Sequence, residues 1–355
     1  MNSLSNQKII YSRIKEDPVM VSFIITIHNH GFILEKVLLG ILSSAVLKFE
    51  IIIVDDASKD HSFQILTKFI NRCSLPNNLI QIIYRRNHFQ KFEVASDNIG
   101  CRLASGKFLC LVQGDMALND RGFDSRIVSL LNRFEIVGAI SGKSVRVFGE
   151  KSISKWVQSQ GHAFKLPKLS KHILMSIFRK NSNLNVYKKN FKKLHKKQDN
   201  FVQIENYLHA EDVDNAFIKL GEINYKVTSL GLKRAIIDSG KLYVGRLINR
   251  GPIFMKRDDF IQVKGFDEKI FFQGWDDYEL STKLLLLGKV VAYSPINFLS
   301  KADWGATQRK KTLWLITLIN IKKIKRSRNR KLAAISNYSK LSLEHELFGK
   351  ILCVK

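Results

Sequence analysis

The chain has 355 residues, of which 45% are hydrophobic and 10% aromatic, so it can bury one large core or two ordinary ones. This composition excludes an intrinsically disordered protein. The formal net charge of +27 predicts an anionic partner, which could be nucleic acid, an anionic membrane surface or an acidic substrate.

Cysteine usage and hydropathy bear on the location of the protein. The four cysteines are scattered without metal-ligand spacing, which favours a reducing compartment. The N-terminus has no apolar signal core, and no stretch reaches the roughly 18 consecutive apolar residues of a membrane-spanning helix. We therefore expect a cytoplasmic protein that could bind peripherally to the inner face of a membrane.

The first half of the chain alternates between predicted strands and predicted helices. A polar lead covers residues 1–17. Apolar, β-branched runs then predict strands at 19–27, 49–54, 79–84 and 108–112. Helical spacing of apolar residues predicts helices between them at 32–44, 61–73 and 93–103. This alternation predicts a doubly wound, parallel α/β sheet.

Polar clusters follow three of these strands, at His28-Asn29, Asp55-Asp56 and Gln113 to Asp115. Ligands of doubly wound sheets bind beyond the carboxyl ends of the strands. The carboxylates of Asp55 and Asp56 suit the hydrogen-bond donors of a nucleotide base or ribose. The simpler interpretation, an aspartate capping the next helix, accounts for one of them but not for both.

Asp115 follows the fourth strand, and Gly114 beside it permits close approach of the backbone. A single aspartate in this position is equally consistent with a loop cap and with a metal ligand. A hard cation such as Mn²⁺ or Mg²⁺ takes oxygen ligands and is often completed by the phosphates of a substrate.

The stretch from Gly265 to Pro295 places three acids, Asp276, Asp277 and Glu279, at the start of an amphipathic helix, directly after Trp275. Acids are common in the first turn of a helix, and capping is therefore the simpler interpretation. Three acids beside Gly-Trp, after a Phe-rich run, favour a functional site.

Two other regions are defined by their charge. Between Lys151 and Lys197 there are thirteen basic residues and no acid, which predicts an insertion of basic amphipathic helices. Residues 312–331 are apolar in their first half and basic in their second. They predict a helix lying on an anionic membrane, or else a helix packed on the core with solvated lysines.

Together these stretches resemble the family 2 glycosyltransferases, which have the GT-A fold. The resemblance runs from Val21 to about Tyr293 and is interrupted by the basic insertion. The matching segments, in chain order, are VSFIITIHNHGFILEKVLLGILSS, IIIVDDASKD, SDNIGCRLASGKF, LCLVQGDM, GPIFMKRDDFIQVKGFDE and FFQGWDDYEL.

The resemblance implies a role for each candidate residue. The residues that it implies for donor binding are Thr26, His28, Asn29, Asp55, Asp56, Asn98 and Gly114. Asp115 would bind the divalent cation at the diphosphate. Asp277 would be the general base, with Asp276 beside it, and Glu279 would contact the acceptor. Trp275 offers an apolar face for the ring of an acceptor sugar, and ordinary packing in the core is an equally good interpretation of it.

Three departures from the family pattern stand out. Gln113 replaces the first aspartate of the metal-binding Asp-x-Asp motif. Asp97 stands where the family often has an arginine, which removes a positive charge near the donor. The segment FLSKADWGAT lacks the histidine ligand of many members, and Asp303 is the only nearby substitute.

The expected organisation is a mixed GT-A sheet flanked by helices, with a basic insertion and a basic tail. The predicted parts are a lead at 1–17, a nucleotide-sugar-binding half at 18–150, a mainly helical insertion at 151–240, an acceptor half at 241–305 and a helical tail at 306–355. The expected activity is inverting transfer from a nucleotide-sugar, with UDP as the expected nucleotide, to a glycan, polysaccharide or lipid-linked acceptor. A catalytically inert scaffold of the same fold is the alternative, and specific nucleic-acid binding is not expected because no nucleic-acid motif is present.

Overall fold

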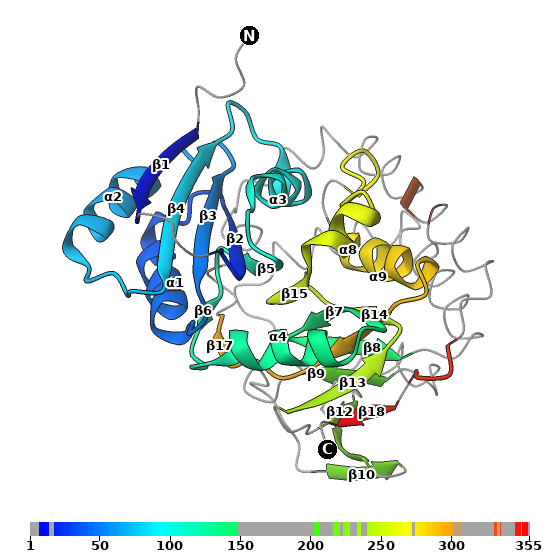
Figure 1. Ribbon diagram of the computed structural model, residues 1–355. Helices are drawn as coiled ribbons and strands as arrows, with labels where there is room; N and C mark the ends of the chain where they lie inside the picture. The colour runs from blue at the N-terminus through cyan, green and yellow to red at the C-terminus, as the bar shows by residue number, and fades with distance from the viewer. Residues whose placement is uncertain are drawn as a thin grey trace, which may run out of the picture.

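The computed structural model describes residues 7–13, 18–147, 202–205, 216–220, 223–227, 233–235, 240–271, 274–300, 304, 330–331, 334, 345–348 and 350–353. Within these residues the largest sheet has ten strands, in the order β1-β4-β3-β2-β5-β15-β7-β16-β13-β18 (Figure 1). Three smaller sheets of two or three strands complete the described β-structure.

The four predicted strands form the parallel part of the large sheet. They are β2 (Val21–Ile27), β3 (Phe49–Asp55), β4 (Leu79–Arg86) and β5 (Phe108–Gln113). Strand β2 lies between β3 and β5, and β4 lies outside β3, with all neighbours parallel. The carboxyl ends of β2, β3 and β5 therefore meet at one edge of the sheet.

The second half of the chain continues the same sheet. Strand β15 (Ile253–Lys256) runs antiparallel between β5 and β7 (Val137–Ser141). Strand β16 (Val290–Tyr293) pairs in parallel with β7, and β13 (Lys241–Gly245) pairs with β16 in the antiparallel direction. Because β15 is antiparallel, the residues just before it lie at the edge where β5 and β7 end.

Helices cover both faces of the sheet. One face packs against α1 (Gly31–Ser44), α2 (Ser62–Arg72) and α4 (Phe123–Arg133). The other face packs against α3 (Phe92–Leu103), α8 (Arg257–Gln262) and α9 (Asp276–Leu286). Helices α3, α8 and α9 follow one another across the sheet in Figure 1. The mixed, helix-flanked sheet confirms the predicted fold class.

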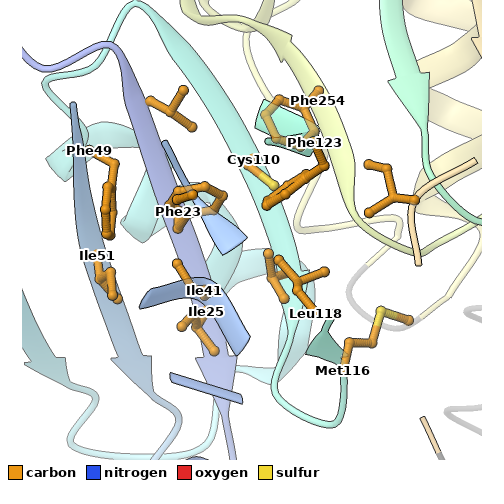
Figure 2. Close-up of a cluster of buried hydrophobic side chains, with 14 of the residues drawn as sticks. Phe23, Ile25, Ile41, Phe49, Ile51, Cys110, Met116, Leu118, Phe123 and Phe254 are labelled. Carbon is orange, nitrogen blue, oxygen red and sulfur yellow. The ribbon is translucent and has the colours of Figure 1, made fainter. Parts of the chain in front are cut away.

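The core on the first face is rich in phenylalanine (Figure 2). Phe23 lies at its centre, with ring centroids 5.5 Å from Phe49, 5.9 Å from Phe123 and 6.4 Å from Phe254. These residues come from β2, β3, α4 and β15, so one aromatic cluster joins the two halves of the chain. Such pairs add to the stabilisation that burial of their apolar area provides.

Short strands form the three smaller sheets. Strands β6 (Ala117–Leu118) and β17 (Phe298–Leu299) pair with each other. Strands β14 (Leu247–Ile248) and β8 (Ser144–Val147) form a second small sheet with β9 (Val202–Glu205). The third contains β10 (Ala216–Leu220), β11 (Ile223–Val227) and β12 (Lys233–Ala235).

The structure differs from the sequence predictions at both edges of the large sheet. The expected polar lead contributes β1 (Gln7–Ser12), which pairs antiparallel with β4. The expected helical tail contributes β18 (Ile351–Cys353), which pairs with β13. An edge strand offers unpaired backbone groups that many sequences can satisfy, so neither addition has a strong sequence signal.

The predicted insertion at 151–240 is strand rather than helix in most of the part that the structure describes, namely β9 to β12. Its most basic segment, 151–197, lies outside the described residues, as does nearly all of the predicted interfacial helix at 312–331 and the candidate ligand Asp303. None of the helices among the described residues combines the length and apolar character needed to cross a bilayer.

Candidate functional site

The turn after β2 is tied to the loop after β3 by side-chain hydrogen bonds. His28 Nδ1 lies 2.7 Å from the carbonyl oxygen of Asp56, so Nδ1 carries the proton that it donates. Asn29 adopts a left-handed backbone with φ of 56°, and its backbone amide donates to Ser58 Oγ at 2.9 Å. Its side-chain oxygen accepts from the backbone amide of Lys59 at 2.7 Å. The pair His28-Asn29 therefore shapes the rim where a donor is expected.

The two aspartates after β3 are both 2% exposed, and both organise the chain around them. Asp55 accepts hydrogen bonds from the backbone amide of Ser58 at 2.7 Å and from the hydroxyl of Tyr84 at 2.5 Å. Burial and the neighbouring Asp55 carboxylate raise the pKa of Tyr84 well above its usual value, which keeps this hydroxyl protonated.

Asp56 accepts hydrogen bonds at the beginning of α3. Its donors are the backbone amides of Lys91 at 2.7 Å and Phe92 at 2.8 Å, together with Asn87 Nδ2 at 2.9 Å. The carboxylate thus satisfies N–H groups that would otherwise lack partners at a helix N-terminus. Both aspartates have structural partners in the protein, and direct contact with a nucleotide stays a prediction for each.

A pocket of about 310 Å³ opens beside Asp55 at the carboxyl edge of β3 and β4. The residues that line it are Lys8, Asp55, Ser58, Asp60, Phe63, Gln64, Tyr84 and Arg86. The ammonium of Lys8 lies 5.1 Å from the ring centroid of Phe63, and Arg86 Nη2 donates to the carbonyl of Ser58 at 2.7 Å. The pocket therefore offers cations, carboxylates and two aromatic rings, those of Phe63 and Tyr84.

A second hollow, of about 540 Å³, lies elsewhere, along α4 beside Leu47. Leu47 precedes β3, so this hollow is at the opposite edge of the sheet. None of the predicted site residues lines it.

The end of β5 packs tightly against β2. A Cβ atom on Gly114 would lie 2.7 Å from the carbonyl oxygen of Thr26 and 3.1 Å from His30 Nδ1, so only glycine fits without a shift. Gln113 donates from Nε2 to Glu93 Oε1 at 2.8 Å. Asp115, half-buried, follows in the next turn. Glycine thus brings Asp115 close to the ends of both strands.

The described residues contain no group of three His, Cys, Asp or Glu side chains that could hold a metal ion. Gln113, in place of an acid, uses its amide nitrogen to bind Glu93. Asp115 would therefore supply one carboxylate to a cation that takes other oxygens from a bound diphosphate and water. This donor set suits Mn²⁺ or Mg²⁺ held jointly with a substrate rather than a preformed metal centre.

The first turn of α9 places the predicted catalytic acids side by side. Asp277 is 9% exposed; its Oδ2 accepts from the backbone amide of Arg250 at 3.1 Å and its Oδ1 from that of Tyr278 at 3.0 Å. Asp276 is 1% exposed, and its Oδ2 accepts from Arg250 Nε at 2.6 Å. Trp275, at the N-cap position with φ of 68°, is half-buried beside the Tyr278 ring.

Glu279 and Asn98 hold the loop at 265–268 in place. Both carboxylate oxygens of Glu279 accept from the backbone amide of Asp267 at 3.0 Å, and Lys283 pairs with the same side chain. Asn98 donates to the Phe266 carbonyl at 2.9 Å and accepts from the Phe266 amide at 3.0 Å. These are structural contacts, and the predicted roles in acceptor and donor binding stay predictions for Glu279 and Asn98.

Arg250 is the residue that sequence reasoning missed. It lies in the loop before β15 and pairs with three carboxylates: Asp276 from α9, and Asp97 and Glu93 from α3. Asp97 also accepts from Thr26 Oγ1 at 2.7 Å. The unusual Asp97 is the sequence feature from which a nearby cation could have been inferred. The sequence contains 58 lysines and arginines, so it did not indicate which one.

Burial shifts the titration of this cluster. It raises the pKa of Asp97 to about 6, while Arg250 acts in the opposite direction and Glu93 adds to the rise. Burial also raises the pKa of Asp276, with Arg250 again opposing the shift. Lys331, 8% exposed, has its pKa lowered by burial while Asp276 acts to raise it. Two cations from distant parts of the chain, Arg250 and Lys331, thus interact electrostatically with Asp276.

Comparison with known proteins shows which family this chain resembles. The family model described as Glycosyl transferase family 2 matches residues 22–199, half of the chain. No curated protein matches the chain.

Among solved structures, the mannosyltransferase PcManGT from Pyrobaculum calidifontis, in complex with GDP-Man and Mn²⁺, is 13% identical, with 92% of this chain and 73% of that chain covered and a TM-score of 0.44. GalNAc-T7 with UDP, GalNAc and Mn²⁺ is 12% identical, with coverage of 79% and 43% and a TM-score of 0.47. S. aureus TarS 1–349 in complex with UDP-GlcNAc is 18% identical, with coverage of 37% and 34% and a TM-score of 0.29. The chain spans less than two thirds of the lengths of the last two proteins.

Proposed function

This chain belongs to glycosyl transferase family 2, and from that premise we propose that it transfers a sugar from a nucleotide-sugar to a hydroxyl group. The proposed donor is a UDP-sugar, and the transfer inverts the configuration at the anomeric carbon. The observation that carries the proposal is the position of Asp277. Its carboxylate stands in the first turn of α9, held by the backbone amides of Arg250 and Tyr278, and α3 and Arg250 link it to the ends of β2 and β5.

Asp277 acts as the general base of this reaction. An acceptor hydroxyl is a weak nucleophile, and a carboxylate within hydrogen-bond reach of it accelerates attack. The backbone amides at Arg250 and Tyr278 fix both oxygens of Asp277, which limits the rotation of the carboxylate. Asp276 beside it is bound to Arg250 and serves to orient the turn. Trp275 offers an apolar face for the ring of an acceptor sugar.

The donor would lie along the carboxyl edge of β2, β3 and β5. The pocket beside Asp55 supplies hydrogen-bonding groups and the aromatic rings of Phe63 and Tyr84 for a nucleobase or ribose. Gly114 lets the end of β5 pack closely against the end of β2, which places Asp115 beside the proposed position of the diphosphate. Asp115 would hold a divalent cation together with the diphosphate oxygens. When bound, such a cation neutralises the charge that develops on the leaving diphosphate.

The acceptor is proposed to be a glycan, a polysaccharide or a lipid-linked saccharide. The net charge of +27 supports a site of action near an anionic surface, such as the inner face of a membrane or an acidic acceptor polymer. Salt screens the attraction between basic side chains and an anionic surface, so binding to anionic vesicles should weaken as ionic strength rises.

Titration calorimetry with UDP and with GDP, each with and without Mn²⁺, is the experiment that tests the proposal. We expect one nucleotide to bind tightly only when Mn²⁺ is present, and Asp115→Ala to abolish that binding. Asp258→Ala, at an exposed position of α8, is the matched control and should bind like the unmodified protein. Incubation with UDP-GlcNAc and with GDP-Man then measures release of the nucleotide. Absence of both nucleotide binding and turnover with common donors would contradict the proposal.

A catalytically inert binding module is the second candidate. It is favoured by Gln113, which replaces an acidic metal ligand of the family pattern. It is also favoured by the internal hydrogen bonds of Asp55, Asp56 and Glu279, because these bonds give each residue a structural role. This alternative predicts that the nucleotide-sugar binds but is not turned over, and that Asp277→Asn changes neither property.

A further inference from the structure

Two halves of the chain meet at the proposed active site, and one side chain bridges them. Strands β2 and β5 and helix α3 belong to the first half, and helix α9 belongs to the second. Arg250 lies between β14 and β15, where the chain has just returned to the carboxyl edge of the sheet. Its side chain is 13% exposed. A buried guanidinium in this position needs compensating charge from its neighbours.

The nitrogens of the Arg250 guanidinium contact carboxylates from both halves of the chain. Nε and Nη2 face Asp276 Oδ2, at 2.6 and 2.5 Å. Nη1 donates to Asp97 and lies 3.4 Å from Glu93 Oε1. The ring of Phe266 lies 5.4 Å from the guanidinium carbon. A lysine carries one compact ammonium and could not reach both sides at once.

Each of the two α3 carboxylates that face Arg250 also accepts a hydrogen bond from a residue at the end of a strand. Asp97 accepts the hydroxyl of Thr26 at 2.7 Å, and Glu93 accepts the amide of Gln113 at 2.8 Å. Thr26 belongs to β2 and Gln113 ends β5, and the two are register partners in the sheet. Arg250 is therefore one contact removed from both strands that would face the donor.

On the α9 side, Arg250 reaches both predicted catalytic acids. Its side chain binds Asp276, and its backbone amide donates to Asp277 Oδ2 at 3.1 Å. A displacement of Arg250 would therefore move the proposed base as well as its neighbour. Buried ion pairs often contribute little net stability, and in some proteins they serve to select one arrangement of the chain.

We propose that Arg250 is a positioning residue that fixes the first turn of α9, and with it Asp277, relative to the ends of β2 and β5 through Asp97. The inference rests on the proposed function, because it assigns a role toward the base of that reaction. It differs from a simpler role in which Arg250 only neutralises Asp276. In the simpler role the contact with Asp97 is dispensable for turnover, whereas positioning requires both ends of the guanidinium to be anchored.

The test compares Arg250→Gln, Arg250→Lys, Asp97→Asn and the double variant Asp97→Asn/Arg250→Gln. Each full-length protein is assayed for kcat and KM of nucleotide release from the donor that the unmodified enzyme turns over, and for UDP affinity by calorimetry. Arg126→Gln is the matched control. Arg126 is another partly buried arginine on α4, and its Nη2 lies 2.8 Å from Asp120 Oδ2 in the loop before that helix.

Positioning predicts a fall in kcat with little change in donor binding. Displacement of a reacting group by about 1 Å can cost about 100-fold in rate, so we expect Arg250→Gln to lose about that factor. KM and UDP affinity should stay within about threefold, because the donor-facing residues keep their own hydrogen bonds. Arg250→Lys should not restore kcat. Asp97→Asn removes the negative charge that anchors the guanidinium, although its amide oxygen can still accept a neutral hydrogen bond, and it should show a comparable loss. The double variant should be no less active than the less active of the two single variants.

Three results would overturn the inference: unchanged kcat in Asp97→Asn, losses that multiply in the double variant, or an equal loss of UDP affinity and kcat. If Arg250→Gln does not fold, Asp97→Asn decides the question, because it leaves the arginine in place.

Failure of the proposed function gives a different pattern, in which the unmodified protein neither binds nucleotides nor turns over donors. Positioning is then tested by hydrogen exchange. Exchange at residues 276–281 should increase in Asp97→Asn relative to Arg126→Gln, and equal exchange in the two variants would overturn it.

Discussion

The carboxylate of Asp277 accepts a 3.1 Å hydrogen bond from the backbone amide of Arg250, a residue that is 27 positions earlier in the chain. The contact joins the start of helix α9 to the loop that leads into β15. It orients the acid that we propose as the general base, and it can survive an isosteric substitution because an amide oxygen also accepts a hydrogen bond.

Replacement of Asp277 by asparagine should therefore remove the base without disturbing the turn. We expect Asp277→Asn to lower kcat by about 100- to 10,000-fold, the usual contribution of a general base. The affinity for UDP should be unchanged. The control is Asp258→Asn on the exposed side of α8, which should retain full turnover. Turnover of Asp277→Asn at the unmodified rate would show that another group takes the proton.

The buried carboxylate of Glu50 should be a major determinant of stability. Glu50 is fully buried and accepts hydrogen bonds from Ser22 Oγ at 2.6 Å, from Gln81 Nε2, and from the Ser105 amide at 2.6 Å. Glu50→Ala leaves these donors without a partner and should lower the free energy of unfolding by about 3 kcal/mol or more. Urea unfolding measures the effect, with the exposed Glu135→Ala as the control. A loss below about 1 kcal/mol would contradict the prediction.

Asp97 should make stability depend on pH in an unusual direction. Burial raises its pKa from the usual 3.8 to about 6 in the folded protein. Between these values the folded protein binds the proton more tightly than the unfolded chain does, so the stability contributed by Asp97 is largest at low pH and falls as pH rises toward 6. The fall is at most about 1.4 kcal/mol for each pH unit.

The contribution is isolated by comparison with Asp97→Asn, which cannot titrate. Urea unfolding of both proteins between pH 4 and 7 should show the unmodified protein losing stability relative to the variant as the pH rises, with a plateau above about pH 6.5. A difference that is constant, or that grows in favour of the unmodified protein, would indicate that Asp97 is fully ionised throughout.

Gly114 should be intolerant of even a methyl group. The added Cβ would lie 2.7 Å from the Thr26 carbonyl oxygen, a backbone atom that cannot move by itself. Gly114→Ala should separate the ends of β2 and β5, lower the free energy of unfolding by about 1–3 kcal/mol, and weaken UDP binding. Gly240→Ala is the control, because no atom lies within 4 Å of its added Cβ. Unchanged UDP affinity in Gly114→Ala would place the diphosphate away from β5.

The sequence alone determined the parallel half of the sheet and the position of its carboxyl edge. The short, β-branched apolar runs that lead to His28, Asp55 and Gln113 are typical of buried strands, and parallel strands place their carboxyl ends together. It also determined α9, because the leucines at helical spacing and Gly288 bound a helix whose first turn holds Asp276 and Asp277. These features depend on local periodicity, which a single sequence displays.

Only the tertiary structure decided which groups these acids contact. Asp97 and Asp276 share Arg250 across 153 and 26 positions of sequence, and Asn98 binds Phe266 across 168. Likewise β1 and β18 complete the sheet from segments whose composition predicts a polar lead and a helical tail. Backbone pairing at an edge requires little of the side chains, and charge pairing among 58 basic residues has no local pattern, so both depend on where the folded chain brings distant segments together.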